Sequence, residues 1–309
     1  MMDKIQQDLL ATVADIHGVP EGAYNIRSNG GLGGRNTTAN IDIVTKEDKP
    51  GIDIIIKAGT KNESVHIPVI ISESGLKDMV YNDFFIGEDA DVTIVAGCGI
   101  HNCGDQTSQH DGIHTFYVGK NARVKYIEKH YGENDPEAVG ENVMNPTTVV
   151  EIEEGGYMEM ETTQIKGIDN TVRDTKAVLK GEGAKLVVRD KLMTHGKQHA
   201  DAIFDVEMNG LDSTCDLISR AVAKDDSTQT FKANIIGNAK CASHTECDAI
   251  IMDNAKISAS PEIVANDLDA ALIHEAAIGR IAGEQLMKLM TLGLSEEEAE
   301  QQIIAGFLK

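Results

Sequence analysis

Gly87-Glu88-Asp89-Ala90-Asp91-Val92 and Gly119-Lys120-Asn121-Ala122-Arg123-Val124 decide the fold, because both follow the phrase Gly-x-x-Ala-x-apolar. Looser copies recur downstream, and two of them are shortened. Because a repeated turn is typical of a stacked architecture, we expect the residue after each turn to point into one core. In the seven copies this inward position falls on Val92, Val124, Met158, Leu186, Cys215, Cys241 and Ile257.

The chain between about residues 40 and 270 predicts β-structure almost throughout. Short β-branched runs such as Ile52-Asp53-Ile54-Ile55-Ile56 alternate with glycine and asparagine turns, and no amphipathic helix of three turns interrupts them. A sandwich, a barrel and a solenoid all fit this texture. The repeated turn favours the solenoid, and its irregular spacing favours a β-helix with insertions.

The two ends of the chain read differently. Residues 3–17 predict a helix with Ile5, Leu9 and Val13 on one face, and residues 27–40 predict a glycine-rich loop that lacks the lysine of a P-loop. Ser295-Glu296-Glu297-Glu298 predicts a capping box that begins a second C-terminal helix. We therefore divide the chain into an N-terminal helix and linker (1–39), a β core (40–270) and a C-terminal helical region (271–309).

Composition excludes some function classes. The chain has 309 residues, 28 basic and 50 acidic, and a net charge of −22. Such a charge repels phosphate backbones, so we expect no nucleic-acid partner. No segment of the sequence predicts a membrane span or a secretion signal, so we expect the protein to be located in the cytoplasm. Five cysteines in such a chain predict free thiols that are either buried filler or ligands.

Three constellations could carry chemistry. Two thiols and three imidazoles fall within 17 residues at Cys98, His101, Cys103, His110 and His114, but their spacing matches no common zinc pattern, and turn chemistry is the alternative.

The second constellation is a set of cysteines at the end of the β region. Cys241 and Cys247 are six residues apart and should share one strand face, with His244 on the other. Cys215 follows an equivalent turn, so it could approach Cys241 if the coils stack. Soft thiolates near one another suit zinc or an iron–sulfur cluster, whereas isolated small cysteines often fill a β core. The third constellation, His274-Glu275, could bind a metal or form a salt bridge at the junction with the helices.

The C-terminal phrases resemble those of the SufB/SufD family. The stretch His274-Glu275-Ala276-Ala277-Ile278-Gly279-Arg280-Ile281, the later Gly293-Leu294-Ser295-Glu296-Glu297-Glu298-Ala299, and Thr245-Glu246-Cys247-Asp248 carry the resemblance. It is specific at the C-terminus and diffuse over the first 150 residues. It implies a right-handed parallel β-helix (solenoid) with short N-terminal and C-terminal helical regions, and a scaffold for iron–sulfur cluster assembly rather than an enzyme.

The resemblance also implies partners and a site. The expected partners are a SufC-type ABC ATPase, which would supply the ATP site that this chain lacks, and a second SufB/SufD-like chain, for which we favour a homodimer. The implied residues that hold a transient iron–sulfur cluster are Cys247, His274 and Glu275, with Cys215 and Cys241 as substitutes. The apolar helix residues expected to bind the ATPase are Leu286, Leu289, Met290, Ile303, Ile304 and Phe307.

Two departures from the family pattern leave alternatives open. The position at which SufB chains carry a key cysteine is Ala255 here, and no cysteine lies between Cys103 and Cys215. The chain could therefore be a SufD-like structural partner that binds the ATPase but no cluster. A β-helix carbohydrate-active enzyme is a more remote alternative, because the chain has only 4% aromatic residues and no tryptophan with which to stack on sugars.

Overall fold

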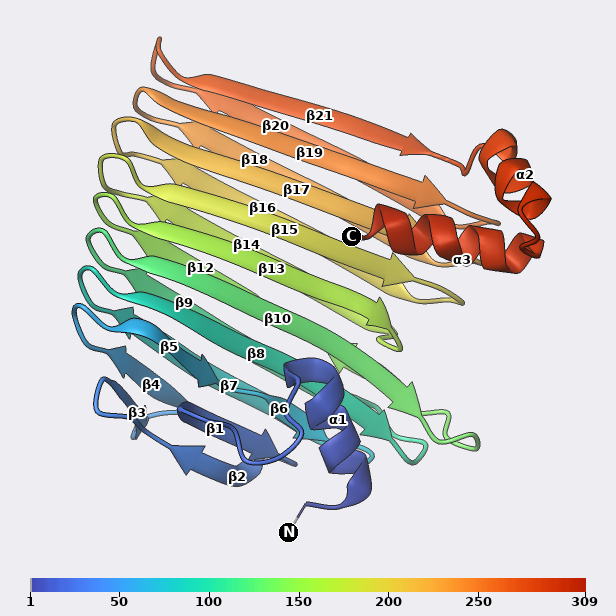
Figure 1. Ribbon diagram of the computed structural model, residues 1–309, viewed down its shortest axis with the longest axis horizontal. Helices are drawn as coiled ribbons and strands as arrows, with labels where there is room; N and C mark the ends of the chain where they lie inside the picture. The colour runs from blue at the N-terminus through green and yellow to red at the C-terminus, as the bar shows by residue number, and fades with distance from the viewer. Residues whose placement is uncertain (1) are drawn as a thin grey trace.

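The protein is a parallel β-solenoid of about eight turns, with short helices at both ends (Figure 1). The computed structural model describes residues 2–309. The all-β core and the terminal helices expected from the sequence are confirmed. Within the described residues, no helix has the length and apolar character needed to cross a membrane.

Two sheets form the long walls of the solenoid, and the chain passes from one to the other at every turn. The first sheet consists, in spatial order, of β2 (Gly31–Asn36), β1 (Ala23–Ser28), β5 (Lys61–His66), β6 (Val69–Ile71), β8 (Asp91–Asn102), β10 (Arg123–Asn134), β13 (Tyr157–Lys166), β15 (Lys185–Thr194), β17 (Ser213–Ala223), β19 (Cys241–Ile251) and β21 (Ala271–Gly279). The second consists of β3 (Ile41–Thr45), β4 (Gly51–Ile56), β7 (Lys77–Ile86), β9 (Ser108–Val118), β11 (Asn142–Met144), β12 (Thr147–Ile152), β14 (Asn170–Leu179), β16 (His199–Met208), β18 (Thr228–Gly237) and β20 (Lys256–Ala265).

Apart from the antiparallel hairpins β1–β2 and β3–β4, the strands pair in parallel and almost without register shifts, so side chains stack in columns from coil to coil. Val92 pairs with Val124, and the same column continues through Met158, Leu186 and Cys215. Alternation along each strand sends every second residue inward, and most of the apolar ones form one large core cluster. The first five inward positions predicted from the turn repeat therefore stack as expected.

The repeated turn is built around one left-handed residue. Asp89, Asn121 and Asp212 have φ between 53° and 56°, and Gly155 and Gly183 occupy the matching place. Glycine, asparagine and aspartate tolerate this conformation best, which explains the composition of the phrase. The turns also bond to one another: the amide of Asp89 donates to the carbonyl of Lys120, and that of Asn121 to Glu154.

The seventh copy of the turn was assigned wrongly. Ile257 pairs with Gln229 on the second sheet, so its turn lies at the opposite end of the strands. That turn stacks on another series, in which Asp253 and Asp225 are the left-handed residues. The same local geometry is needed at both ends, so the sequence phrase alone cannot separate them.

The N-terminal segment is more ordered than the sequence predicts. The helix α1 (Lys4–Ala14) begins with a capping box at Asp3 and packs its apolar face on the outside of the first sheet. The carbonyl of Val13 comes so close to Gly97 that a β-carbon there would lie 2.3 Å from it. The prediction of a loop over residues 27–40 is wrong, because β1 and β2 form an antiparallel hairpin whose first strand joins the first sheet.

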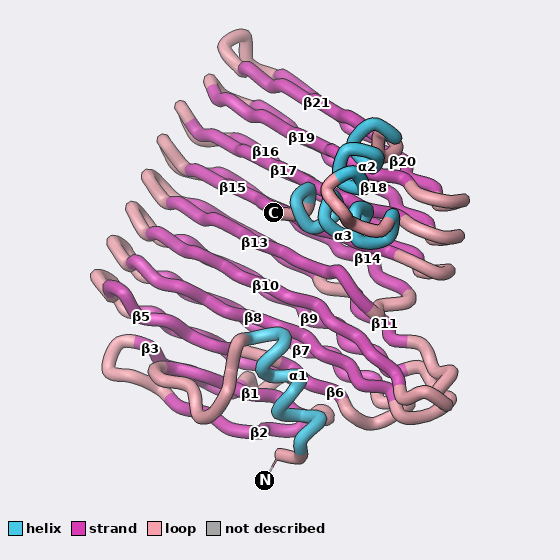
Figure 2. Tube along the Cα trace, turned by 45° about the vertical axis from the view of Figure 1, so that its right-hand side comes forward, coloured by secondary structure: helices cyan, strands magenta, loops and turns pink. Residues whose placement is uncertain are grey.

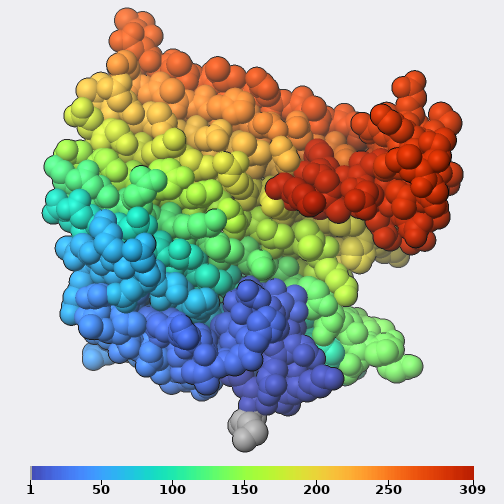
Figure 3. Space-filling model, viewed as in Figure 1, coloured from blue at the N-terminus to red at the C-terminus, as the bar shows by residue number. Residues whose placement is uncertain are grey.

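The C-terminal region begins later than expected. Residues 271–279 form β21, the outermost strand of the first sheet, and the helices α2 (Gly283–Thr291) and α3 (Glu296–Phe307) follow. The predicted capping box at Ser295 is present. Both helices lie at one end of the strands, where α3 crosses the outside of the first sheet and α2 projects beyond it (Figures 2 and 3).

Candidate functional site

The inner faces of β17 and β19 hold the three buried thiols predicted as ligands: Cys215 is on β17, and Cys241 and Cys247 are on β19. Cys215, Cys241 and Cys247 are between 1% and 4% exposed. As predicted, Cys241 and Cys247 share the inner face of β19, while His244 lies outside and bonds to Asp216 at 3.1 Å. The three thiols therefore belong to the last coils of one core.

Cys215 and Cys241 are not equivalent, which corrects the sequence alignment of their turns. Cys215 pairs with Ser243, and Cys241 pairs with Ser213. Cys241 thus occupies the small-residue position of the turn, where earlier copies have alanine, glycine or serine. The two cysteines are offset by two residues along the strand, so stacking brings them near each other without placing one above the other.

Cys247 ends a polar column inside the solenoid. It pairs with Ser219, which pairs with Asp190 on the strand before. The Ser219 hydroxyl donates to Asp190 at 3.3 Å, and Asp190 forms an ion pair with Arg173. All of these side chains are buried. The Asp190–Arg173 ion pair therefore lies two strands from Cys247 in this column, with Ser219 between them.

His274 and Glu275 lie on opposite faces of β21. His274 pairs with Thr245 on the inner face, two residues from the position that pairs with Cys247. Glu275 pairs with Glu246 and is exposed on the outer face. A strand turns alternate side chains to opposite faces, so Glu275 cannot join the inner cysteines within one chain.

Unpartnered polar atoms gather on these last inner faces. Both ring nitrogens of His274 are buried, and neither has a hydrogen-bond partner among residues 2–309. The hydroxyl oxygens of Ser243, Thr245 and Ser213 are in the same condition. Buried polar groups are normally paired, since an unpaired one costs about 1–3 kcal/mol. These buried polar atoms are free to contact a ligand in this part of the solenoid.

The electrostatics keep the thiols protonated in the isolated chain. Burial, with smaller effects of nearby aspartates, raises the pKa of Cys215 and of Cys247 to about 12. Burial also raises the pKa of Cys241. Burial lowers the pKa of His274, and the nearby His244 adds to this effect. A neutral imidazole can donate a lone pair to a metal, whereas the thiols must lose protons first.

The predicted ligands do not converge in one chain. In the described residues, no three His, Cys, Asp or Glu side chains lie close enough to hold one metal ion. This applies to the five predicted cluster residues and also to the zinc constellation of the sequence. Cys98 is buried in the core, Cys103 is exposed, and His101 bonds at 3.0 Å to both Glu133 and Asp135.

Sequence reasoning missed a buried polar cluster at the middle of the solenoid. Glu128 lies 3.4 Å from His130, and His114 bonds to the Tyr126 hydroxyl at 2.8 Å. Interactions with His130 and His114 outweigh burial and lower the pKa of Glu128 to about 2, whereas burial lowers that of His114 to about 4. The alternation of side chains along the strands predicts that these residues face inward, but it does not show which of them contact one another.

The six helix residues expected to bind a partner are not buried by this chain. Met290 is 42% exposed, and the other five are half-buried. The helix α3 is held by Ala299, which is fully buried, and by a bond from Arg220 to the carbonyl of Phe307 at 3.2 Å. The apolar faces of α2 and α3 are therefore partly exposed to solvent, so a partner could still contact them.

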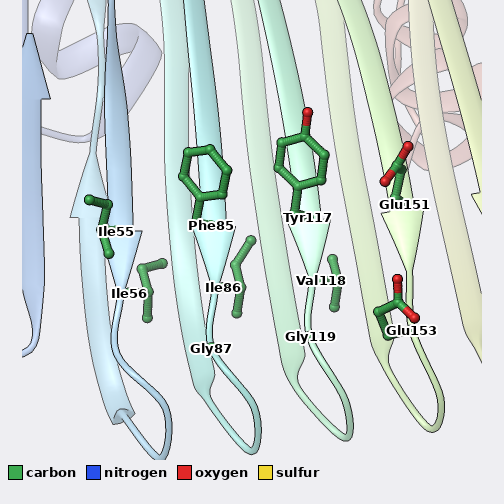
Figure 4. Close-up of a pocket in the computed structure, with 10 residues that line it drawn as sticks. All are labelled: Ile55, Ile56, Phe85, Ile86, Gly87, Tyr117, Val118, Gly119, Glu151 and Glu153. Carbon is green, nitrogen blue, oxygen red and sulfur yellow. The ribbon is translucent and has the colours of Figure 1, made fainter. Parts of the chain in front are cut away.

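A second apolar surface lies on the outside of the second sheet. Ile55, Phe85 and Tyr117 project side by side from successive strands over a groove of about 370 Å³ (Figure 4). The rings of Phe85 and Tyr117 stack with centroids 5.1 Å apart. Among the described residues that line this groove there is no cysteine or histidine, and the charged ones are Glu151 and Glu153.

The fold and the inner thiols define a class, a parallel β-solenoid with candidate soft-metal ligands in its last coils. The family of the chain is given by comparison with known proteins: the profile of the SufBD core domain of the SUF system for FeS cluster assembly matches residues 74–307. The chain belongs to this family, and membership implies a role in iron–sulfur cluster assembly.

Curated relatives agree with this assignment. A SufBD family protein of Methanocaldococcus jannaschii is 30% identical over 257 residues, which are 82% of this chain and 79% of that protein. A SufBD family protein of Methanothermobacter thermautotrophicus is 28% identical over 78% of this chain and 57% of its own length. SufB of Bacillus subtilis is 29% identical over 72% of this chain and 47% of its own length. The chain thus spans about half the length of the latter two relatives.

Proposed function

We propose that this chain is a scaffold subunit on which iron–sulfur clusters are assembled, acting with a SufC-type ABC ATPase and a second copy of itself rather than as an enzyme. The cluster is cargo, held transiently by Cys215, Cys241, Cys247 and His274 of the last coils. Glu275, on the outer face, would contribute only across an interface between chains.

The unpartnered imidazole of His274 carries this proposal. Its ring nitrogens have no hydrogen-bond partner, and it lies on the inner face of β21, two residues from the position that pairs with Cys247, in a chain of the SufBD family. Imidazole and thiolate both suit iron and zinc. Binding a metal would displace the thiol protons and give one ring nitrogen of His274 the partner that it lacks, while the other nitrogen keeps its proton.

The open end of the solenoid supports pairing of two chains. β20 and β21 are the outermost strands, and each has a free edge in the described chain. Ile263 and Ile278 on these strands are 41% and 40% exposed, although the residues that they stack on are buried. Exposed edges and apolar ends of solenoids are normally covered. A second copy would cover them and bring two sets of ligands together.

The test is anaerobic reconstitution of the purified chain with ferrous iron and sulfide, alone and with its ATPase. We expect sulfide-to-iron charge-transfer absorbance in the wild type and its loss in Cys247→Ser and His274→Ala. Cys98→Ser, also a buried thiol, and Cys103→Ser, an exposed one, are matched controls that should load normally. Equal loading of all four variants would refute the proposed ligands.

A SufD-like structural role is the second candidate, favoured by the absence of three convergent ligands among residues 2–309 and by the protonated thiols. This role predicts that the chain binds the ATPase through α2 and α3 but never loads a cluster. Met290→Glu should then abolish co-purification with the ATPase, whereas Met79→Glu, at a residue 47% exposed on β7, should not. ATPase binding without any cluster would select this candidate.

A further inference from the structure

A cavity opens at the N-terminal end of the solenoid, far along the chain from Cys215, Cys241 and Cys247. It lies between the hairpin β1–β2 and the hairpin β3–β4 and has a volume of about 380 Å³. Its floor consists of Ile52, Ile67, Val69 and Val80, all at most 5% exposed. Volume and floor suit a small ligand with an apolar body.

The walls of this cavity are cationic, in contrast to the chain as a whole. Arg27, Arg35, Lys46 and Lys49 line it, and within the described residues no aspartate or glutamate does. The whole chain has 50 acidic residues against 28 basic ones. Four cations without a lining carboxylate therefore form a local exception that favours an anion.

Two of the four cations form ion pairs with aspartates that do not line the cavity. Arg27 forms a bidentate pair with Asp78, with bonds of 2.8 and 2.6 Å, and the Lys46 ammonium lies between Asp53 and Asp83. The four lining cations and the three aspartates that pair with two of them carry a net charge of +1. The free charge resides on the remaining two cations.

Arg35 and Lys49 have neutral partners only. The Nε and Nη1 of Arg35 donate at 2.8 Å to Asn25 and Thr45, which fixes the guanidinium, while its Nη2 donates to none of the residues 2–309. The Lys49 ammonium lies 4.6 Å from the centroid of the Tyr81 ring. Glu47 and Asp48 share its turn, but neither lines the cavity or pairs with it. Arginine held in this way is suited to an anionic head group.

We propose that this cavity binds a small organic anion, whose carboxylate or phosphate head is held by Arg35 and Lys49 and whose apolar body rests on the floor. The site is independent of the cluster residues, which lie on β17, β19 and β21. Failure of one proposal therefore leaves the other intact.

The test uses two fluorescent probes with the full chain: anilinonaphthalene sulfonate, which is anionic, and N-phenyl-1-naphthylamine, which has the same arene without the charge. We expect saturable binding of the sulfonate, weakened about tenfold or more in Arg35→Gln/Lys49→Gln, because each charge-assisted bond is worth roughly 1.5–3 kcal/mol. Binding of the neutral probe should not change. Lys49→Glu, in an exposed turn, repeats the test with little risk to the fold.

The matched control is Lys185→Gln/Lys232→Gln, which removes the same charge from exposed strand positions outside the cavity. Equal weakening in this control, or unchanged binding in the cavity variants, would overturn the proposal. Benzoate and phenyl phosphate then compete with the sulfonate: displacement by one or the other identifies the head group, and displacement by neither would also refute the site.

Discussion

At the scale of single residues, the thiols of the last coils differ from Cys103 in their environment. Cys103 is exposed, whereas Cys98, Cys215, Cys241 and Cys247 are buried, with raised pKa values. Since the thiolate is the reactive form, we expect a disulfide reagent at neutral pH to modify one thiol per folded chain and five in denaturant. Rapid modification of more than one thiol in the folded protein would contradict this burial.

The same thiols make stability depend on alkaline pH. In the unfolded chain a cysteine loses its proton near 9.0, but Cys215 and Cys247 hold theirs up to about 12 in the folded protein. Their contribution is therefore complete below pH 9.0 and is lost as pH rises towards about 12. Chemical unfolding of Cys215→Ala/Cys247→Ala should show a shallower decline over this range than the wild type. An unchanged slope would count against the raised pKa values.

Truncation to alanine should reduce the stability of the folded protein much more at His114 than at His274. His114 is bonded to Tyr126 and Asn82, so His114→Ala leaves buried partners unpaired and should cost about 2 kcal/mol or more. His274 has no such partners, so His274→Ala should change stability by less than about 0.5 kcal/mol while removing the proposed ligand. Denaturant titration of both variants checks the contrast, and a large cost at His274 would indicate a structural role.

The face of the strand on which a side chain lies was easier to predict than the residue that it pairs with on the next strand. The inward direction of Cys241 and Cys247 follows from strand alternation and is confirmed. The pairing of Cys215 with Ser243 depends on the register between strands, which the turn alignment misjudged by two residues. That His274 faces inward and Glu275 outward required knowing that both lie on a strand rather than in the helical region.

At the scale of elements, the left-handed turn position is the feature that repeats. Asn121 has φ 55° there, and Asn121→Ala should cost roughly 1 kcal/mol, since a β-carbon without a polar side chain is disfavoured in this region. Asn121→Gly adopts the same φ freely and should be close to neutral. Thermal unfolding of the two variants makes the comparison, and equal melting points would show that the turn conformation is not limiting.

The turn repeat identified the solenoid because each coil needs the same sharp bend. It failed where the chain uses that bend at both ends of the strands, as at Asp253 and Asp212. The hairpin at β1–β2 was missed because its glycines indicate a loop by composition, although the strand pairs on both sides of β1 order it. Tertiary pairing here outweighs local preference.

At the scale of the whole molecule, the proposed homodimer depends on the open end of the solenoid. Ile278→Glu places a charge on the inner face of β21, where the side chain is 40% exposed, so the single chain should still fold. We expect the variant to be monomeric by light scattering at concentrations at which the wild type is a dimer. Ile55→Glu, at a residue 41% exposed on β4, is the control. A variant that remains dimeric would place the interface elsewhere.

The stacked columns of this solenoid also act as a ruler. Asp190, Ser219, Cys247 and Ala276 occupy one column on four successive strands of the first sheet. Neighbouring strands are about 4.8 Å apart, so exchanging two residues of such a column moves a functional group by one known step without turning it. Cys247→Ser with Ser219→Cys shifts the thiol by one strand towards the middle of the solenoid. Cys247→Ala with Ala276→Cys shifts it by one strand towards the open end, to β21. Cluster loading of these variants would show how many strands from the open end of the solenoid a thiol can lie and still bind a cluster together with a second chain.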